Sequence, residues 1–113
     1  MFGNFNFNDL AEKLPVGIRI MNLSNCNVES LYDVANLFYK CTNLDLSSNL
    51  IREIDFDMDF GTVTYLYMAG CPVGDQYFNW DNQYTEEYPG YVISNGVYFS
   101  FGYFEDYMWV ISD

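Results

Sequence analysis

With 113 residues, half of them hydrophobic, the chain has the size of one domain and enough apolar side chains to build a core. All four basic residues lie in the first 52 positions, where five acids bring the charge to −1, while the positions from Glu53 onward hold eleven acids and no Lys, Arg or His. A net charge of −12 excludes direct binding to DNA, RNA or an anionic membrane, so the expected partner is a basic protein.

The first predicted element is a short helix in the stretch NDLAEKLP. It begins near Asn8 and ends before Pro15, because proline cannot continue the helical hydrogen-bond pattern. Residues 1–15 are therefore expected to form an N-terminal helical cap on the segment that follows.

Three eleven-residue windows come next and align without gaps: IRIMNLSNCNV (18–28), CTNLDLSSNLI (41–51) and VTYLYMAGCPV (63–73). Each has apolar residues at positions 1, 4, 6 and 11 and Cys or Asn at position 9, and their starts are 23 and 22 residues apart. Residues 16–75 therefore resemble the leucine-rich repeat, whose segment reads L-x-x-L-x-L-x-x-N/C-x-L. The resemblance implies a short α/β solenoid of parallel strands that recognises another protein.

Within each window, positions 4 and 6 are expected on the inward face of a strand and positions 3, 5 and 7 on the outward face. Position 9 needs a small polar group that bonds the turning backbone, as Asn49 does with an amide and Cys26 and Cys71 can do with thiols. Those two cysteines would lie two strand spacings apart, roughly 9 to 10 Å, which is too far for a disulfide. The predicted inward residues are Met21, Leu23, Leu44, Leu46, Leu66 and Met68.

The two segments between the windows differ. The first, ESLYDVANLFYKC, has apolar residues at helical spacing behind Ser30, so it predicts a short helix with Ser30 as N-cap. The second, REIDFDMDFGT, alternates apolar and polar residues strictly and predicts an extended segment.

Residues 55–61 of that second segment read DFDMDFG, which is similar to the start of an EF-hand calcium loop. The match fails because the glycine is at the seventh loop position and Leu66 stands where the twelfth needs Glu. Besides weak calcium binding, two interpretations stay open: a solvated face opposite inward apolar residues, or carboxylates about 6.5 Å apart that face the Lys and Arg side chains of a phosphate-binding protein. The row is Asp55, Asp57 and Asp59.

Residues 76–113 are expected to form an aromatic, acidic β cap within the same single domain. The polar stretch 74–87 predicts a surface loop. Asn95-Gly96 between two β-rich runs predicts a hairpin, and YMWVIS (107–112) predicts a further strand. Together, residues 88–112 predict a β-meander that extends the sheet.

Catalytic chemistry has few candidate residues. Histidine is absent, which excludes Ser-His and Cys-His pairs, and there is no Gly-rich phosphate loop and no spaced Cys/His metal set. We therefore expect no enzyme activity, no cofactor and no metal. The odd number of cysteines, three, and the absence of a signal-peptide pattern or long apolar stretch favour a cytoplasmic protein with reduced thiols.

The functional hypothesis combines outward tyrosines with acids, the composition of an interface centre. By composition, the chain is similar to phage anti-restriction and anti-CRISPR inhibitors, which implies that it blocks the basic nucleic-acid-binding surface of an enzyme. Two alternatives stay open: an antitoxin or immunity protein for a basic toxin, and an ordinary leucine-rich-repeat interaction protein whose acidity keeps it soluble. The predicted contacts are Asp45, Tyr65, Tyr67, Asp75, Trp80, Asp81, Glu86 and Glu87, with Asp55, Asp57 and Asp59 as a second patch.

Overall fold

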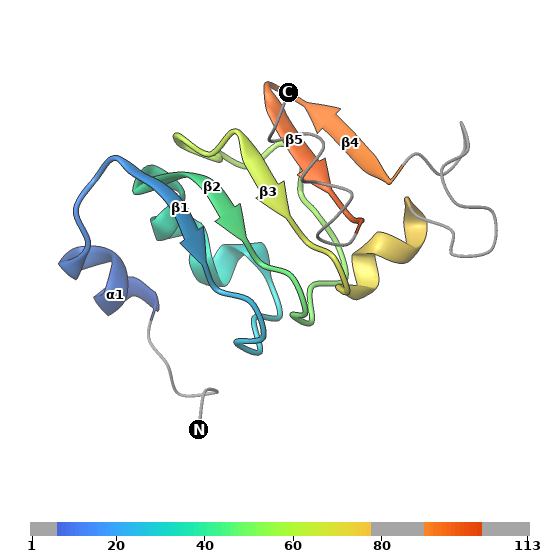
Figure 1. The fold of residues 1–113 in the computed structure, drawn as a ribbon, viewed down its shortest axis with the longest axis horizontal. Helices are drawn as coiled ribbons and strands as arrows, with labels where there is room; N and C mark the ends of the chain where they lie inside the picture. The colour runs from blue at the N-terminus through green and yellow to red at the C-terminus, as the bar shows by residue number, and fades with distance from the viewer. Residues whose placement is uncertain (1–6, 78–89, 103–113) are drawn as a thin grey trace.

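The fold is a small α/β arrangement built on one mostly parallel sheet (Figure 1). The computed structural model describes residues 7–77 and 90–102. The five strands of these residues lie in the order β1-β2-β3-β5-β4. The elements are α1 (Phe7–Lys13), β1 (Ile18–Asn22), η2 (Leu31–Tyr39), β2 (Cys41–Asp45), β3 (Tyr65–Tyr67), η3 (Pro72–Gln76), β4 (Tyr91–Ser94) and β5 (Val97–Ser100).

The strands of the three sequence windows lie side by side and run parallel. Met21 pairs with Leu44, and Leu44 pairs with Leu66, which is the register that the gapless alignment of the windows predicts. Because the windows start 22 or 23 residues apart, residues at the same window position lie side by side in neighbouring strands. All six predicted inward residues are buried, with exposed fractions of 9% or less.

The position-9 residues bond the turning backbone from inside, as predicted. Asn49 is 2% exposed, and its amide bonds backbone groups of both its own window and the preceding one. The thiol of Cys71 lies 3.2 Å from the carbonyl oxygen of Leu46, and that of Cys26 lies 3.4 Å from the carbonyl oxygen of Ser24. All three cysteines are free thiols, and burial raises the pKa of Cys41 to about 11.

The last two strands correct the predicted meander. The Asn95-Gly96 hairpin is confirmed, with φ of 52° and 81° at the two turn residues, as a type I′ turn requires. However, β5 pairs in parallel with β3, and β4 lies antiparallel at the outer edge, so the chain does not add strands in order. The reason lies in the side chains: β5 supplies Phe99, fully buried beside Leu66, whereas β4 alternates exposed and half-buried residues. The strand predicted at 107–112 lies outside the described residues.

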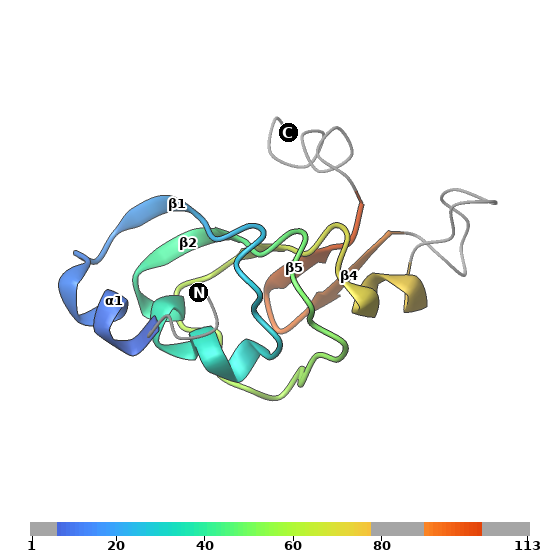
Figure 2. The same ribbon diagram turned by 90° about the horizontal axis from the view of Figure 1, so that it is seen from below.

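A second layer covers one face of the sheet. Figure 2 shows α1, η2 and the segment between β2 and β3 together below the strands. The predicted helix at Asn8 is confirmed as α1, and the helix behind Ser30 is confirmed in place, with the Ser30 hydroxyl accepting from the Tyr32 N–H at 3.1 Å. This second helix is a 3₁₀ helix. Its buried Leu31, Val34 and Leu37 recur every three residues, which is the 3₁₀ period.

The segment 52–62 was expected to be extended, and that prediction is wrong. It consists of coil and turns, with the N–H of Met58 bonded to the carbonyl oxygen of Asp55 at 3.2 Å. The predicted alternation in burial does hold, because Phe56 and Met58 are half-buried and Phe60 is buried while the intervening aspartates are exposed. The aspartate side chains bond the backbone of this segment themselves, so it turns without forming a ladder with a neighbouring strand.

Aromatic contacts join this segment to the rest of the core. Phe60 lies between Phe38 of η2 and Phe99 of β5, with ring-centroid distances of 5.3 and 5.2 Å, and Phe56 meets Phe99 edge to face at 5.1 Å. Such tilted and edge-to-face pairs are favoured ring geometries. The cluster therefore fixes the second layer against the far strands of the sheet.

Candidate functional site

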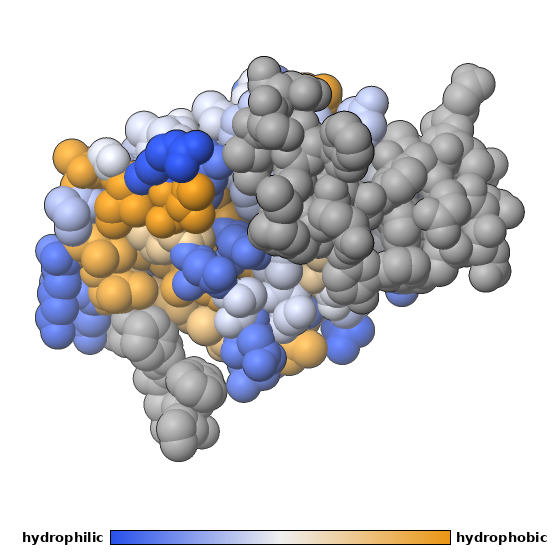
Figure 3. Space-filling view, viewed as in Figure 1, coloured by the Kyte–Doolittle hydropathy of each residue, from blue (hydrophilic) through white to orange (hydrophobic). Residues whose placement is uncertain are grey.

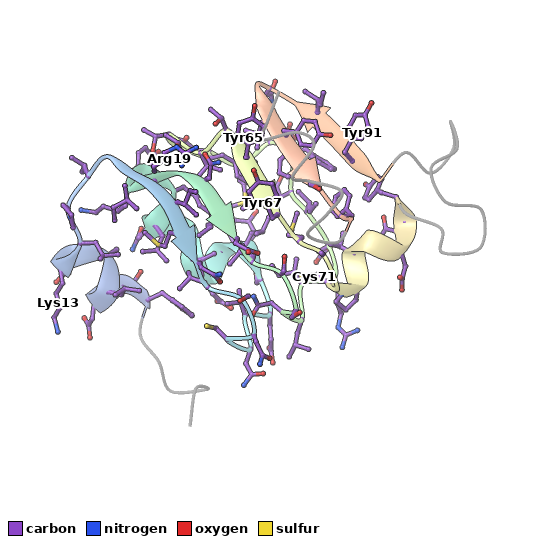
Figure 4. The ribbon with its side chains drawn as sticks, in the orientation of Figure 1. Lys13, Arg19, Tyr65, Tyr67, Cys71 and Tyr91 are labelled. Atoms are coloured by element: carbon purple, nitrogen blue, oxygen red, sulfur yellow. The ribbon has the colours of Figure 1, made fainter. Side chains whose placement is uncertain are left out.

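Four tyrosines gather on the outward face of the sheet, and we call them the tyrosine cluster: Tyr65, Tyr67, Tyr91 and Tyr98. Figure 4 shows Tyr65 and Tyr67 on β3 and Tyr91 on β4. Strand pairing sets Tyr98 directly beside Tyr65, at a ring-centroid distance of 5.8 Å. Tyr91 stacks on Tyr98 at 5.0 Å, and Tyr67 stacks on Tyr65 at 6.3 Å.

Accessibility varies within the tyrosine cluster. Tyr91 is 41% exposed, and Tyr65 and Tyr98 are half-buried, so these three offer ring surface to a partner. Tyr67 is only 2% exposed, which corrects the prediction that it is an accessible contact residue. Burial, followed by the neighbouring hydroxyls of Tyr91 and Tyr65, raises the pKa of Tyr98, so the Tyr98 hydroxyl stays protonated at neutral pH.

Sequence reasoning missed Tyr91 and Tyr98 because it placed their hairpin in a meander. A signal was present: Phe99 and Phe101 are two residues apart, like positions 4 and 6 of a window, and both are buried as those positions are. Reading β5 as a fourth strand in that frame would have placed Tyr98 at the outward position beside Tyr65.

Asp45 lies beside the tyrosine cluster, in register with Tyr67. Its carboxylate accepts a hydrogen bond from the Ser47 N–H at 3.0 Å, and Asn22 makes the equivalent bond to the Ser24 N–H at 2.8 Å. Both side chains therefore close the turn that follows their strand. Asp45 is half-buried, so this candidate partner-binding residue also has a structural role in the turn.

A second group of carboxylates lies on the loops of the helix-bearing side, and we call it the acidic face. Three of its carboxylates, Glu29, Glu53 and Asp55, line two adjoining grooves of about 350 and 280 Å³ that share Ser30 and Glu53. Arg52 is the basic residue among the described lining residues of these grooves. The acidic face comprises Glu29, Glu53, Asp55, Asp57 and Asp59, all exposed.

Two of these carboxylates are held in place by tyrosines of η2. The hydroxyl of Tyr32 donates to Asp55 and that of Tyr39 donates to Asp59. Each carboxylate also accepts from a backbone N–H two residues on, Asp57 at 2.9 Å and Gly61 at 2.8 Å. The tyrosine bond first, and then the backbone bond, lower the pKa of both carboxyl groups, so they are ionised at neutral pH.

These hydrogen bonds and the burial of the apolar side chains account for the alternation in DFDMDFG. Within residues 7–77 and 90–102, no three His, Cys, Asp or Glu side chains converge as metal ligands would. The outer two aspartates bond tyrosines and turns, and the middle one, Asp57, projects from an exposed turn. The alternating sequence of residues 55–60 therefore directs its apolar side chains toward the core and its aspartates toward the surface.

The remaining predicted contacts are distributed as follows. Asp75 is exposed on η3, which occupies the start of the predicted surface loop. Trp80, Asp81, Glu86 and Glu87 lie outside the described residues. No helix in the described part of the chain has the length and apolar character needed to cross a membrane. Comparison of the chain with protein families, with curated proteins and with solved structures found no match in any of the three.

Proposed function

We propose that residues 16–75 are a short run of leucine-rich repeats, and that the protein is a non-enzymatic inhibitor that binds the basic, nucleic-acid-binding surface of a partner enzyme. This is the mode of action of anti-restriction and anti-CRISPR proteins. The observation that carries the proposal is the acidic face, with its five exposed carboxylates and its paired tyrosines. The partner would contact these carboxylates with lysines and arginines that otherwise bind phosphates.

The fixed positions of Asp55 and Asp59 support this role. A carboxylate already bonded to a tyrosine and a turn loses little freedom when a partner binds, so less of the binding free energy is spent on ordering it. Both keep their charge because their pKa values are lowered. Asp57, exposed between them, is placed to contact a basic side chain directly.

The distribution of charge supports the same partner class. Among the described residues from Glu53 onward there are five acids and no basic residue. A field of one sign speeds association with an oppositely charged partner and repels nucleic acid from the same surface. Binding would therefore be fast and would weaken as salt rises.

The test is a pull-down with tagged full-length protein, in which captured proteins are eluted with duplex DNA or RNA. Asp57→Lys is the test variant, and Glu12→Lys on α1 is its matched control, since both residues are exposed and both substitutions change the charge by the same amount. We expect Asp57→Lys to reduce capture of a basic, nucleic-acid-displaced enzyme about tenfold or more, because a charge is reversed inside the interface. Glu12→Lys should change capture less than about twofold.

A third variant reverses Asp81, Glu86 and Glu87 together and tests the predicted loop contacts. Loss of capture with this variant alone would move the interface from the acidic face to that loop while keeping the charge-based mechanism. If neither variant reduces capture, or if nucleic acid displaces nothing, charge mimicry is wrong.

The tyrosine cluster favours a second candidate, recognition of a neutral protein surface by an ordinary repeat module. Tyr65, Tyr91 and Tyr98 form a contiguous, partly exposed aromatic surface of the kind found at interface centres. In that case Tyr91→Ala would abolish capture, Asp57→Lys would leave it intact, and binding would resist salt.

A further inference from the structure

The hairpin of β4 and β5 forms an uncharged edge on a strongly acidic protein. Residues 90–102 contain no charged side chain, although the whole chain has a net charge of −12. Ile93 is 63% exposed and Tyr91 is 41% exposed, and both point to the outward face of the sheet, next to Tyr98 and Ser100. Exposed apolar residues on a strand edge are typical of a surface that pairs with another chain.

The backbone of β4 also has one side directed away from the sheet. The carbonyl oxygen of Gly90 accepts a hydrogen bond from the N–H of Phe101, and Ser94 and Val97 flank the two-residue turn. In an antiparallel pair the backbone groups of every second residue point to the partner strand, so those of Val92 and Ser94, like the Gly90 carbonyl, point to β5. It follows that the N–H and C=O groups of Tyr91 and Ile93 point toward the outer edge. Among the described strands, β4 has a neighbour on the β5 side alone.

We propose that a second copy of this chain pairs with β4 edge to edge, so that two sheets join in a symmetric dimer. A register centred on Val92 sets Tyr91 of one copy opposite Ile93 of the other, which gives four backbone hydrogen bonds and two cross-strand aromatic–aliphatic contacts. The two tyrosine clusters then lie on one continuous face.

The charge pattern decides between β1 and β4, the two outer strands of the sheet formed by the described residues. A symmetric pairing brings identical residues together, and like charges in such a pair are destabilising. The other outer strand, β1, carries exposed Arg19, labelled in Figure 4, so pairing there would place arginines of two copies near each other. Figure 3 shows a strongly hydrophilic patch beside hydrophobic surface on this side of the molecule. Residues 90–102, which include β4, carry no such charge, so pairing along β4 brings no like-charged side chains of these residues together.

The experiment is sedimentation velocity of the full-length protein over a range of concentrations. The paired strand is short, so we expect weak association, with a dissociation constant on the order of 10 to 100 μM. Raising NaCl from about 0.05 M to about 0.5 M should strengthen the dimer several-fold because salt screens the repulsion between the two anionic copies. This is opposite to the salt dependence expected for capture of a basic partner.

Ile93→Lys is the test variant and Ile20→Lys is the matched control. Ile20 is 49% exposed, lies on the same face and in the same row of the sheet, and belongs to the opposite edge. We expect Ile93→Lys to raise the dissociation constant at least tenfold, so that the dimer is no longer detected. Ile20→Lys should change the dissociation constant less than about twofold. Melting temperatures of both variants are measured in parallel, and Ile93→Thr replaces Ile93→Lys if the latter unfolds, because threonine keeps the β-branched shape.

A protein that stays monomeric at all concentrations and salt levels overturns the proposal. So does a dimer that is insensitive to the substitution at Ile93, or one that loses its stability equally when Ile20 is replaced.

Discussion

Asn49 joins two neighbouring turns through a single buried amide. Its Oδ1 accepts from the N–H groups of Cys26 and Val28, both at 2.9 Å, and its Nδ2 donates to the carbonyl oxygens of Leu23 at 3.0 Å and Leu46 at 2.9 Å. An amide is the side chain that can donate and accept at once in this space, whereas a thiol does so weakly. The windows therefore depend on this residue more than on Cys26 or Cys71.

We predict that Asn49→Ala lowers the free energy of unfolding by about 3 to 4 kcal/mol, because several buried backbone groups lose their partner. Asn49→Cys places the residue of the other two windows at this site and should cost less, about 2 kcal/mol, since the thiol retains a weak donor. Urea denaturation measures both. A loss below about 1 kcal/mol for the alanine variant would contradict the assigned role.

The bonds from Tyr32 and Tyr39 predict a pH dependence of stability. Asp55 and Asp59 have lowered pKa values in the folded protein, so their contribution is present above the unfolded carboxyl pKa of about 3.9. It is lost as the pH falls through the lower folded values. The double variant Tyr32→Phe, Tyr39→Phe should therefore be less stable than the parent protein at pH 7 and lose that difference under strongly acidic conditions. Thermal melts as a function of pH measure this, and a difference independent of pH would show that the hydroxyls do not act on these carboxylates.

At the scale of elements, the turn-rich segment 52–62 meets η2 at one point of very close approach. Gly61 has a φ of +57°, and a Cβ atom there would lie 2.6 Å from the carbonyl oxygen of Phe38. Next to it, the N–H of Thr62 donates to that same oxygen at 2.8 Å. Glycine thus allows the segment to close onto the end of the helix and to bring Asp59 within reach of Tyr39.

We predict that Gly61→Ala destabilises the protein by about 3 kcal/mol or more, from backbone strain plus the collision with Phe38. Gly17→Ala is the matched control: Gly17 also has a positive φ, of +85°, but nothing lies within 4 Å of an added Cβ. Gly17→Ala should lower the free energy of unfolding by about 1 kcal/mol, which is the contribution of backbone strain without a collision. Equal losses in chemical denaturation would show that the close approach contributes nothing.

The elements that could be predicted from the sequence are those whose signals are local. Window spacing predicted the parallel register of β1, β2 and β3, Ser30 predicted the start of η2, and Asn95-Gly96 predicted the hairpin. The position of β5 depends on a contact between residues far apart in the sequence, because Phe99 is buried beside Leu66 of β3. Alternation in segment 52–62 predicted which side chains are buried but not the backbone path, because the side-chain bonds of Asp55 and Asp59 determine the turns.

The candidate site was predictable in composition and less so in geometry. The sequence identified Tyr65 and the aspartate row as candidates. The contacts that position these side chains join residues 20 to 33 positions apart, such as the hydrogen bond of Tyr39 with Asp59 and the ring contact of Tyr65 with Tyr98, and no local pattern predicts them. Burial of Tyr67 was missed because strand alternation specifies the face on which a side chain lies and not what covers it.

At the scale of the whole molecule, a net charge of −12 on 113 residues opposes compaction through self-repulsion. We predict that added NaCl raises stability by about 1 kcal/mol and the melting temperature by a few degrees, because screening weakens this repulsion. Differential scanning calorimetry at increasing NaCl tests it. Asp57→Lys and Glu12→Lys, which both reduce the negative charge, should show a smaller salt effect, and a flat response in the parent protein would argue against repulsion as a destabilising term.

The antiparallel β4 has a consequence for how the chain can vary in length. On the proposal that residues 16–75 are leucine-rich repeats, parallel strands with a 22- to 23-residue period can be added one after another, since each new strand repeats the surface of the last. The reversal at β4 interrupts the parallel order of the strands, and α1 packs against η2. On the same proposal, we expect a chain carrying a duplicate of residues 41–62 to gain one strand in the middle of the sheet and to keep β1 and β4 as its outer strands.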